Sequence, residues 1–421
     1  MKLSLLLFSS LLALSLSPRN FSAAGGFDLL LPPSYPVESP GGDPWMGLRV
    51  FDVNDYGAVA DGKTENSLAF MRAWEDACGY KGSSMLLIGE GSFLVDNLTF
   101  SGPCFNGLSP KVLILGTLIA PANPTTDVWV RFQSLRRLIL TGGNGSAILN
   151  GQGAQTWSFG SACRQHMTCD IFATSLKLSN VWDGIVGNIN LVDSKGFHVS
   201  VYGCDNVHIF GFNISAPWDS QNTDGIHVSQ STNINITDSN IGVGDDCVSI
   251  GPGSINVSVS NVRCGPGHGI SVGSLGKYKM ENDVIGLRVE NCTINGTQNG
   301  VRVKTWPGDL ASNATNLTFQ NIVMINVSNP IIIDQQYCPN HSCHLQQSSS
   351  VKLSNIDISN ISGTYNSEFA VNIQCSSTTP CENIQLSYIN LTSTQPPERD
   401  EIGHFNCKGA INAFTIFNST F

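Results

Sequence analysis

Charged residues are scarce in this chain. They make up 13% of the 421 residues, with 22 Lys and Arg against 32 Asp and Glu, and the net charge is −10 at pH 7. A mainly helical protein needs Lys and Glu on its exposed faces, so this shortage disfavours that class. The negative charge also argues against general nucleic-acid binding. An anionic ligand would need a local group of cations.

Long apolar runs are equally rare. One such run, Leu3–Leu16, follows Lys2 and precedes small residues that end at Ala24. This order predicts a secretory signal peptide over 1–24, and the run is short for a membrane span. No later stretch of the sequence is long and apolar enough to cross a bilayer. We therefore expect a secreted protein that is free of the membrane once the signal is removed.

Helical patterns are nearly absent as well. Only Ser67–Cys78 has helical spacing, with apolar residues at Leu68, Phe70, Ala73, Trp74 and Ala77. We expect this segment to form a helix that caps the N-terminal end of the fold. Residues 25–48, rich in Gly, Pro and Ser, predict a flexible leader. A single folded domain is expected over 49–421.

What the chain has instead is a repeat. From Met85 onward, short β-rich runs alternate with Gly, Asn, Asp and Ser, and Asp224, Asp246 and His268 are 22 residues apart each time. The absence of helices between the runs disfavours a doubly wound α/β fold. Sandwich and barrel folds stay open, but the constant period favours a right-handed parallel β-helix. Residues one period apart would stack about 4.8 Å from one another.

Three carboxylates fall in two successive coils of this repeat, at Asp224, Asp245 and Asp246. A single Asp at such a place is most often a turn residue. Three stacked together repel one another unless one is protonated or cations lie nearby. A raised carboxyl pKa is useful in acid–base catalysis, so the group is a candidate catalytic site.

Cations follow in the next coils. Arg302 and Lys304 are two residues apart, which places them on one side of a strand. Such a pair is often a solvated strand edge, but beside carboxylates it would neutralise the acids and bind an anionic substrate. His268 stacks in line with two Asp and is a candidate catalytic or orienting residue. We interpret His227 as structural or supporting, and Tyr337 as either a core residue or a stacking platform for a sugar ring.

The thirteen cysteines fit an oxidising compartment. An odd number leaves at least one thiol unpaired, and Cys204 and Cys292, within β-rich runs, are the expected buried free thiols. No tight Cys/His cluster has metal-ligand spacing. Five pairs are placed to close small loops or join neighbouring coils: Cys78/Cys104, Cys163/Cys169, Cys247/Cys264, Cys338/Cys343 and Cys375/Cys381. The many Asn-X-Ser/Thr sites predict a glycoprotein, although Asn also suits left-handed turns and side-chain ladders.

Four ordered motifs carry a family resemblance: NTDGIHV (222–228), GDDC (244–247), GHG (267–269) and RVK (302–304). With them the chain closely resembles the secreted plant polygalacturonases over about residues 50–390. The resemblance implies a right-handed parallel β-helix, in the extracellular space and cell wall, that hydrolyses α-1,4-galacturonan in pectin with inversion. It implies no cofactor and no metal, and we expect a monomer.

The resemblance also implies roles for single residues. Asp245 would be the general acid, Asp224 and Asp246 would activate water, and His268 would support the acid. Four residues would bind the substrate: Asn222, Arg302, Lys304 and Tyr337.

Geometry limits this assignment. Simple stacking puts the carboxylates of neighbouring coils near 5 Å, whereas inverting enzymes need about 6.5–9.5 Å. Asp245 and Asp246 also cannot both face outward on one regular strand. A bend at Gly242–Gly244 would remove both difficulties, and we predict one there.

Two alternatives to the main interpretation stay open. The same acid–base set would serve a hydrolase of rhamnogalacturonan or of substituted galacturonan. A secreted, non-catalytic pectin-binding β-helix is also possible, although binding alone does not require three Asp. The chain departs from the family pattern at Gln221, and again after Cys407, where the C-terminal cap is expected to be incomplete.

Overall fold

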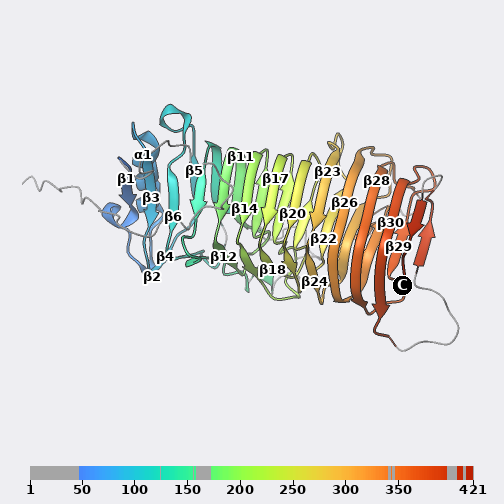
Figure 1. Ribbon diagram of the computed structural model, residues 1–421. Coiled ribbons are helices and arrows are strands. Elements are labelled where there is room, and N and C mark those ends of the chain that lie inside the picture. Colours follow the sequence, from blue (N-terminus) through green and yellow to red (C-terminus); the bar gives the residue numbers. More distant parts are fainter. Residues whose placement is uncertain are drawn as a thin grey trace, which may run out of the picture. The chain divides into compact units, whose positions relative to one another are not determined.

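The computed structural model describes residues 47–410 and 414–420, apart from 124, 155, 158–171, 340–342, 344–346 and 396–404. The expected signal peptide, nearly all of the expected leader, and the Cys163/Cys169 pair lie outside these residues. The strands form a right-handed parallel β-helix, in which each strand pairs in parallel with strands of the preceding and following coils (Figure 1). The predicted fold class is confirmed.

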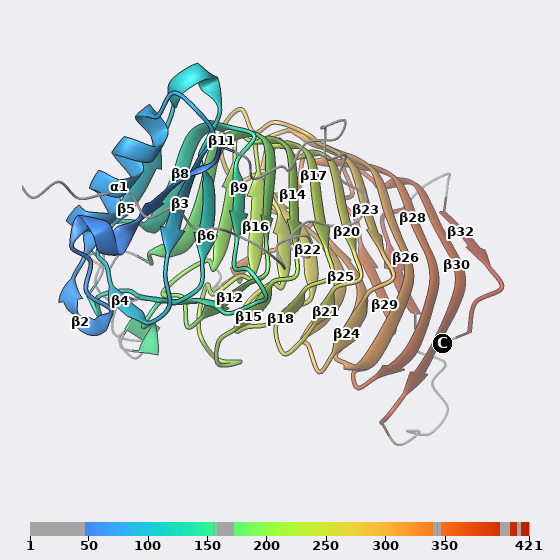
Figure 2. The same ribbon diagram turned by 60° about the vertical axis from the view of Figure 1, so that its left-hand side comes forward.

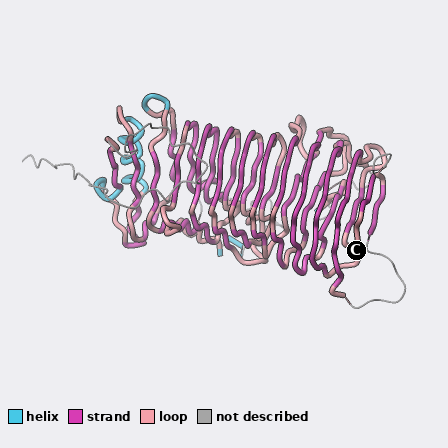
Figure 3. The backbone as a smooth tube through the Cα atoms, in the orientation of Figure 1, coloured by secondary structure: helices cyan, strands magenta, loops and turns pink. Residues whose placement is uncertain are grey.

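Three rows of strands run along the helix (Figures 2 and 3), and we call the row that carries the acidic residues at its strand starts the floor sheet. It consists of β5 (Leu98–Ser101), β8 (Val128–Arg136), β11 (Thr174–Gly187), β13 (Val199–Tyr202), β16 (Ile226–Ser229), β19 (Val248–Ile250), β22 (Ile270–Leu275), β25 (Asn299–Thr305), β27 (Asn329–Asp334), β29 (Val371–Gln374) and β31 (Phe405–Lys408).

The other two rows complete each coil. The second sheet comprises β1 (Arg49–Asp52), β3 (Ser84–Ile88), β6 (Lys111–Ile114), β9 (Ile139–Thr141), the end of β11, β14 (Asp205–Phe210), β17 (Thr232–Thr237), β20 (Ile255–Ser260), β23 (Val284–Glu290), β26 (Asn313–Val327), β28 (Lys352–Tyr365), β30 (Glu382–Ser393) and β32 (Phe414–Phe417). The third comprises β2 (Asp61–Glu65), β4 (Ser92–Leu94), β7 (Thr117–Ile119), β10 (Ala147–Asn150), β12 (Ile189–Val192), β15 (Asn213–Ser215), β18 (Asn240–Gly242), β21 (Arg263–Cys264), β24 (Thr293–Asn295) and the ends of β26, β28 and β30.

The core follows from the alternation of side chains along these strands. On the floor sheet, Ile226 pairs with Val248, Val248 with Ile270, and Ile270 with Val301, and all four side chains are buried. Such aliphatic ladders fill the inside of the coils, while the residues between them face outward. The first two pairings are 22 residues apart, so the predicted period is confirmed, and Asp224, Asp246 and His268 stand at equivalent places in successive coils.

The N-terminal end is covered by α1 (Ser67–Gly79), which confirms the predicted helix. Phe70 and Trp74 are buried, and the Trp74 indole N–H donates to the carbonyl of Ser101. Leu68 was expected on the apolar face and is 62% exposed, because it lies on the opposite side of the first turn. Within the described part of the chain, no helix is long and apolar enough to cross a membrane.

Four of the five expected cysteine pairs form disulfides: Cys78–Cys104, Cys247–Cys264, Cys338–Cys343 and Cys375–Cys381. Cys204 and Cys292 are buried free thiols, as predicted. Cys407 on β31 is also unpaired, and Phe417 on the last strand is 48% exposed. Among the described residues, the last strand thus has partly exposed apolar side chains, whereas Phe70 and Trp74 of α1 are buried at the other end.

Asparagines serve the coil geometry as expected. Asn256 and Asn360, both in glycosylation sequences, adopt positive φ angles of 54° and 51°. The amide of Asn360 also donates to Asn321 in the preceding coil, which itself donates to Asn291. Stacked amides of this kind satisfy one another from coil to coil, so several sequons have a structural use.

Candidate active site

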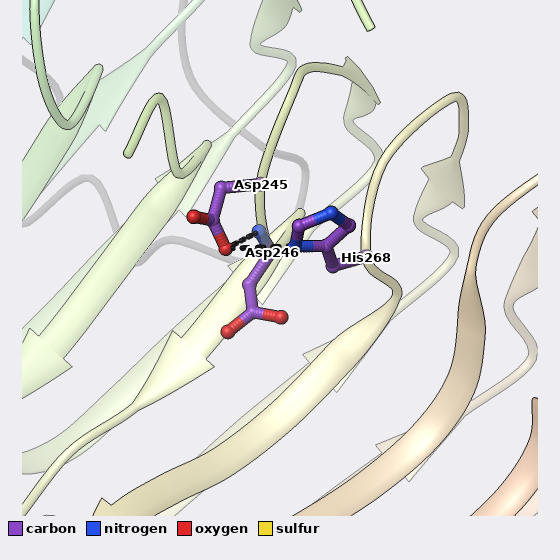
Figure 4. A group of neighbouring side chains, drawn as sticks. All are labelled: Asp245, Asp246 and His268. Atoms are coloured by element: carbon purple, nitrogen blue, oxygen red, sulfur yellow. Dashed lines mark hydrogen bonds and ion pairs between the residues drawn. The ribbon is translucent and has the colours of Figure 1, made fainter. Parts of the chain in front are cut away.

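The acidic residues lie in the turns that enter the floor sheet. Strand β18 ends at Gly242 and β19 begins at Val248, so the chain leaves strand geometry where the bend was predicted. Between these strands Asp245 and Asp246 project in different directions (Figure 4). Gly244 is required in this turn because a Cβ there would collide with the backbone of Ser220. Because of the bend, the two adjacent carboxylates have different surroundings and can take different parts in a reaction.

Asp246 is the most deeply buried carboxylate of the group, with 1% of its surface exposed. It accepts hydrogen bonds from Lys304 Nζ at 2.7 Å and from Ser271 Oγ at 2.6 Å. Burial opposes the charge of Lys304, but the Asp246 carboxylate outweighs that effect and raises the pKa of the Lys304 ammonium. The two groups form a buried ion pair, which holds Asp246 in place as an anion.

Asp224 has a different environment. It is buried and accepts a hydrogen bond of 2.7 Å from Ser249 Oγ, and Ser249 in turn meets Nδ1 of His227 at 2.9 Å. Burial, followed by the charges of Asp245 and Asp246, raises the pKa of Asp224 well above its ordinary value. Asp224 is therefore the carboxyl of this group that keeps its proton most readily in the free protein.

Asp245 and His268 form the accessible part of the cluster (Figure 4), with 24% and 35% of their side chains exposed. His268 Nδ1 lies 3.1 Å from Asp245 Oδ1, which also accepts the backbone N–H of Asp246. Burial would raise the pKa of Asp245, but the contact with His268, the charge of Lys304 and this N–H lower it overall. His268 sits between glycines, and Gly269 adopts a φ of 86° where a Cβ would strike the next coil.

The predicted substrate-binding residues fall into two settings. The guanidinium of Arg302 and the ammonium of Lys304 lie 4.9 and 5.4 Å from the Tyr337 ring centre, and Tyr337 packs edge-on against Trp306. Arg302 Nε has no hydrogen-bond partner among the described residues, whereas Lys304 is held by Asp246. Asn222 is exposed in the turn before Asp224, with a φ of 55°. Of the two cations, Arg302 is thus the one without an ion pair within 4.0 Å among the described residues.

Sequence reasoning missed Ser249 and Ser271, which hold the two buried carboxylates. The signal was present, because each stands three residues after a member of the 22-residue series. The corresponding residue after Asp224 is His227, and the three pair across β16, β19 and β22. The repeat therefore carries a second ladder of polar residues, which positions the first.

A groove of about 380 Å³ opens beside His268, within the size range of small-molecule sites. The indole of Trp218 stands 73% exposed at its edge. Its lining has two amide side chains and a carboxylate but neither Arg302 nor Lys304: Trp218, Asp219, Gln221, Gly244, Pro266, Gly267, His268, Gly296 and Gln298. The groove lies next to the acid cluster and offers amide and aromatic contacts to the hydroxyl groups and ring face of a sugar.

Asp245, Asp246 and His268 each offer a ligand atom, all within 4.8 Å of one another. The Asp246 carboxylate is already paired with an ammonium, and Asp245 is in contact with His268. An ammonium inside the cluster disfavours a divalent cation and suits proton transfer. The arrangement is that of an acid–base site.

An acid–base site of grouped carboxylates, set in the turns of a parallel β-helix beside cations, is typical of enzymes that cleave polysaccharides. The family model of "Glycosyl hydrolases family 28" matches residues 78–410. The chain belongs to this family and is a glycoside hydrolase.

Proteins with similar sequences support the same family assignment. An exopolygalacturonase of Platanus acerifolia is 44% identical over 346 residues, which covers 82% of this chain and 90% of that protein. A polygalacturonase of Gossypium barbadense is 40% identical over 345 residues, covering 81% and 83%. The predicted family is confirmed.

Solved structures show the same fold at low identity. The endo-xylogalacturonan hydrolase of Aspergillus tubingensis has a TM-score of 0.72 at 22% identity, covering 89% of this chain and all of that one. Endopolygalacturonase I of Stereum purpureum, complexed with two galacturonates, has a TM-score of 0.58 at 18% identity, covering 82% and 98%. At these identities the comparison concerns the β-helix alone.

Proposed function

We propose that this protein hydrolyses α-1,4-linked galacturonan, the main chain of pectin, with inversion at the anomeric carbon. The observation that carries the proposal is the assembly of Asp224, Asp245, Asp246 and His268 beside Arg302. Arg presents a planar fork that fits a carboxylate, and galacturonan carries one carboxylate on every sugar. The names of the plant relatives agree with this substrate.

Asp245 is the proton donor in this mechanism because its side chain is accessible, whereas Asp224 and Asp246 are buried. It transfers a proton to the glycosidic oxygen as the bond to the anomeric carbon breaks. Water activated by the Asp224–Asp246 pair attacks that carbon from the other face and gives its proton to the pair. Lys304 holds Asp246 in place through their ion pair, and Arg302, with Tyr337 and Asn222, holds the sugar.

The lowered pKa of Asp245 in the free protein must rise before it can act as the acid. A bound galacturonate brings negative charge and excludes water, and both effects raise the pKa of a nearby carboxyl. Substrate binding would thus favour the protonated form of Asp245 that the reaction needs. The raised pKa of Asp224 leaves Asp246, paired with Lys304, as the anion nearest the attacking water.

The test is incubation of the secreted protein with polygalacturonic acid, with a reducing-end assay, product sizing and NMR of the first anomer formed. We expect new reducing ends whose anomeric configuration is opposite to that of the substrate. Retention would overturn the mechanism, and binding without cleavage would favour the pectin-binding alternative. We also propose that the mature protein is a secreted monomer of the cell wall.

A further inference from the structure

The floor sheet carries a continuous outward ladder through the acid site. Lys177 pairs with Ser200, Ser200 with His227, His227 with Ser249, and Ser249 with Ser271. The ladder continues to Arg302 on the C-terminal side. On the N-terminal side it runs through Arg131, which pairs with Lys177, to Thr99. Cations thus flank on both sides the polar residues that support the carboxylates.

The N-terminal cations form the more unusual end. Arg131 and Lys177 are direct partners in neighbouring strands, about 4.8 Å apart along the sheet. Like charges placed opposite each other in this way destabilise a sheet. Arg131 Nε is buried without a hydrogen-bond partner among the described residues, and Asp127 approaches only its Nη2, at 3.7 Å from a carboxylate that is 75% exposed. Nothing described on this flank neutralises the second charge.

An exposed ring accompanies the cations. Lys177 Nζ lies 5.4 Å from the ring centre of Tyr202, which is 47% exposed on the same face of the sheet. Burial, and next the charge of Arg131, lower the pKa of Lys177. A bound anion would reverse the second effect. Two adjacent cations that share one exposed carboxylate, Asp127, and stand beside an aromatic ring match a sugar acid, whose carboxylate and ring face need those two contacts.

We propose that Arg131, Lys177 and Tyr202 form a second carboxylate-binding subsite, which holds galacturonate residues on the N-terminal side of the cleavage point. The proposal rests on the proposed function, because it extends the same substrate along the same sheet. From Ser249 beside Asp224, Lys177 is three strands away and Arg131 four, or about 14 and 19 Å. A chain of several sugars is needed to reach them, so kcat/KM should be higher for longer substrates.

The experiment measures kcat/KM on galacturonate oligomers of increasing length, from the dimer to the octamer. For the wild type we expect kcat/KM to rise with length until the chain spans the ladder. For the double variant Arg131→Met and Lys177→Met the rise should stop earlier, with a loss of about tenfold or more on the longest oligomers and little change on the shortest. Lys177→Arg should restore most of the loss, since it keeps the charge.

A matched control is Lys352→Met, on β28 of the second sheet, where Lys352 forms an exposed ion pair with Glu382. It should leave the length profile unchanged. Added salt should shrink the difference between wild type and double variant. The proposal is overturned if the double variant keeps the wild-type length dependence, or loses the same factor at every length.

Failure of the proposed function would look different. In that case the wild type would cleave none of the oligomers. The subsite would then be judged by calorimetric binding of the galacturonate hexamer, which must weaken in the double variant and not in the Lys352→Met control.

Discussion

The centre and the N-terminal flank of the floor sheet differ in how their charged side chains are paired. At the centre, Asp246 and Lys304 are buried and paired, and serines hold the carboxylates. On the flank, Arg131 and Lys177 are half-buried and have only the exposed carboxylate of Asp127, 3.7 Å from Arg131, as a close anion among the described residues. The centre has its counter-charges built in, whereas the flank leaves them to a ligand. Changes at the centre should therefore affect turnover and stability, and changes on the flank should affect substrate affinity.

The largest effect is expected for Asp245→Asn. An amide cannot supply the proton, so kcat should fall by roughly 10²–10⁴-fold, while KM changes little. Initial rates on polygalacturonic acid measure both constants. Asp309→Asn, at an exposed carboxylate outside the cluster, is the matched control and should stay near wild type. A kcat within twofold of wild type in Asp245→Asn would remove this residue as the donor.

Lys304→Met tests the buried pair at the centre. It strands the Asp246 carboxylate without its counter-charge, and breaking such a pair costs about 3–5 kcal/mol of unfolding free energy. Urea unfolding should show this loss, with a fall in kcat as well as a rise in KM. Lys352→Met breaks an exposed pair for comparison, at about 0–1 kcal/mol. Equal losses in the two variants would contradict the contrast between buried and exposed charge.

Asp224→Asn separates activity from stability. Because the pKa of Asp224 is raised on folding, the native protein holds a proton that the unfolded chain loses above about pH 4. Stability therefore falls as pH rises from that value through the raised pKa. Asn does not titrate, so the variant should gain Tm relative to wild type between pH 4 and pH 7 while losing turnover. A Tm difference that stays constant with pH would count against the raised pKa.

Arg302→Met tests the cation that Asp246 does not hold. Loss of one charge-assisted contact costs about 1.5–3 kcal/mol, so KM for polygalacturonic acid should rise by roughly tenfold or more. On fully methyl-esterified oligomers, which lack the anion, the change should be much smaller. A KM that rises equally on both substrates would mean that Arg302 does not recognise the carboxylate.

The smallest effect is expected at the groove beside His268. Trp218→Ala removes an exposed ring that lines the groove but has no role in proton transfer in the proposed mechanism. Loss of one aromatic contact is worth about 0.5–1.5 kcal/mol, a few-fold in KM, with kcat unchanged. Tryptophan fluorescence during substrate titration gives an independent reading. A large fall in kcat would place Trp218 much closer to the chemistry than the groove suggests.

The sequence predicted the fold because Asp224, Asp246 and His268 are separated by the same number of residues in successive coils. The period of 22 placed Asp224, Asp246 and His268 correctly, and the two adjacent Asp required the bend that the structure has at Gly242–Val248. It predicted that Arg302 and Lys304 would neutralise the acids, but not which carboxylate each would meet, because the contact of Lys304 with Asp246 joins residues 58 positions apart. It also missed Lys177, since coils before Asp224 have other lengths.

Leu68 and the cap residues show a further limit. Apolar spacing predicted the helix, but which apolar residue turns inward depends on where α1 meets β1, β3 and β5. Packing between elements decides that, and the pattern along one element does not contain it.

In the parallel ladder, the number of strands between the flank and the acids determines the distance between them. Each coil adds one strand, about 4.8 Å, to the floor sheet, and a pyranose residue advances by a similar length along its chain. A grafted coil between β13 and β16 would move Lys177 away from Asp224 by one such step without altering either end. Substrate-length preference in this fold would then be an adjustable quantity, set by the number of coils and changed in whole units.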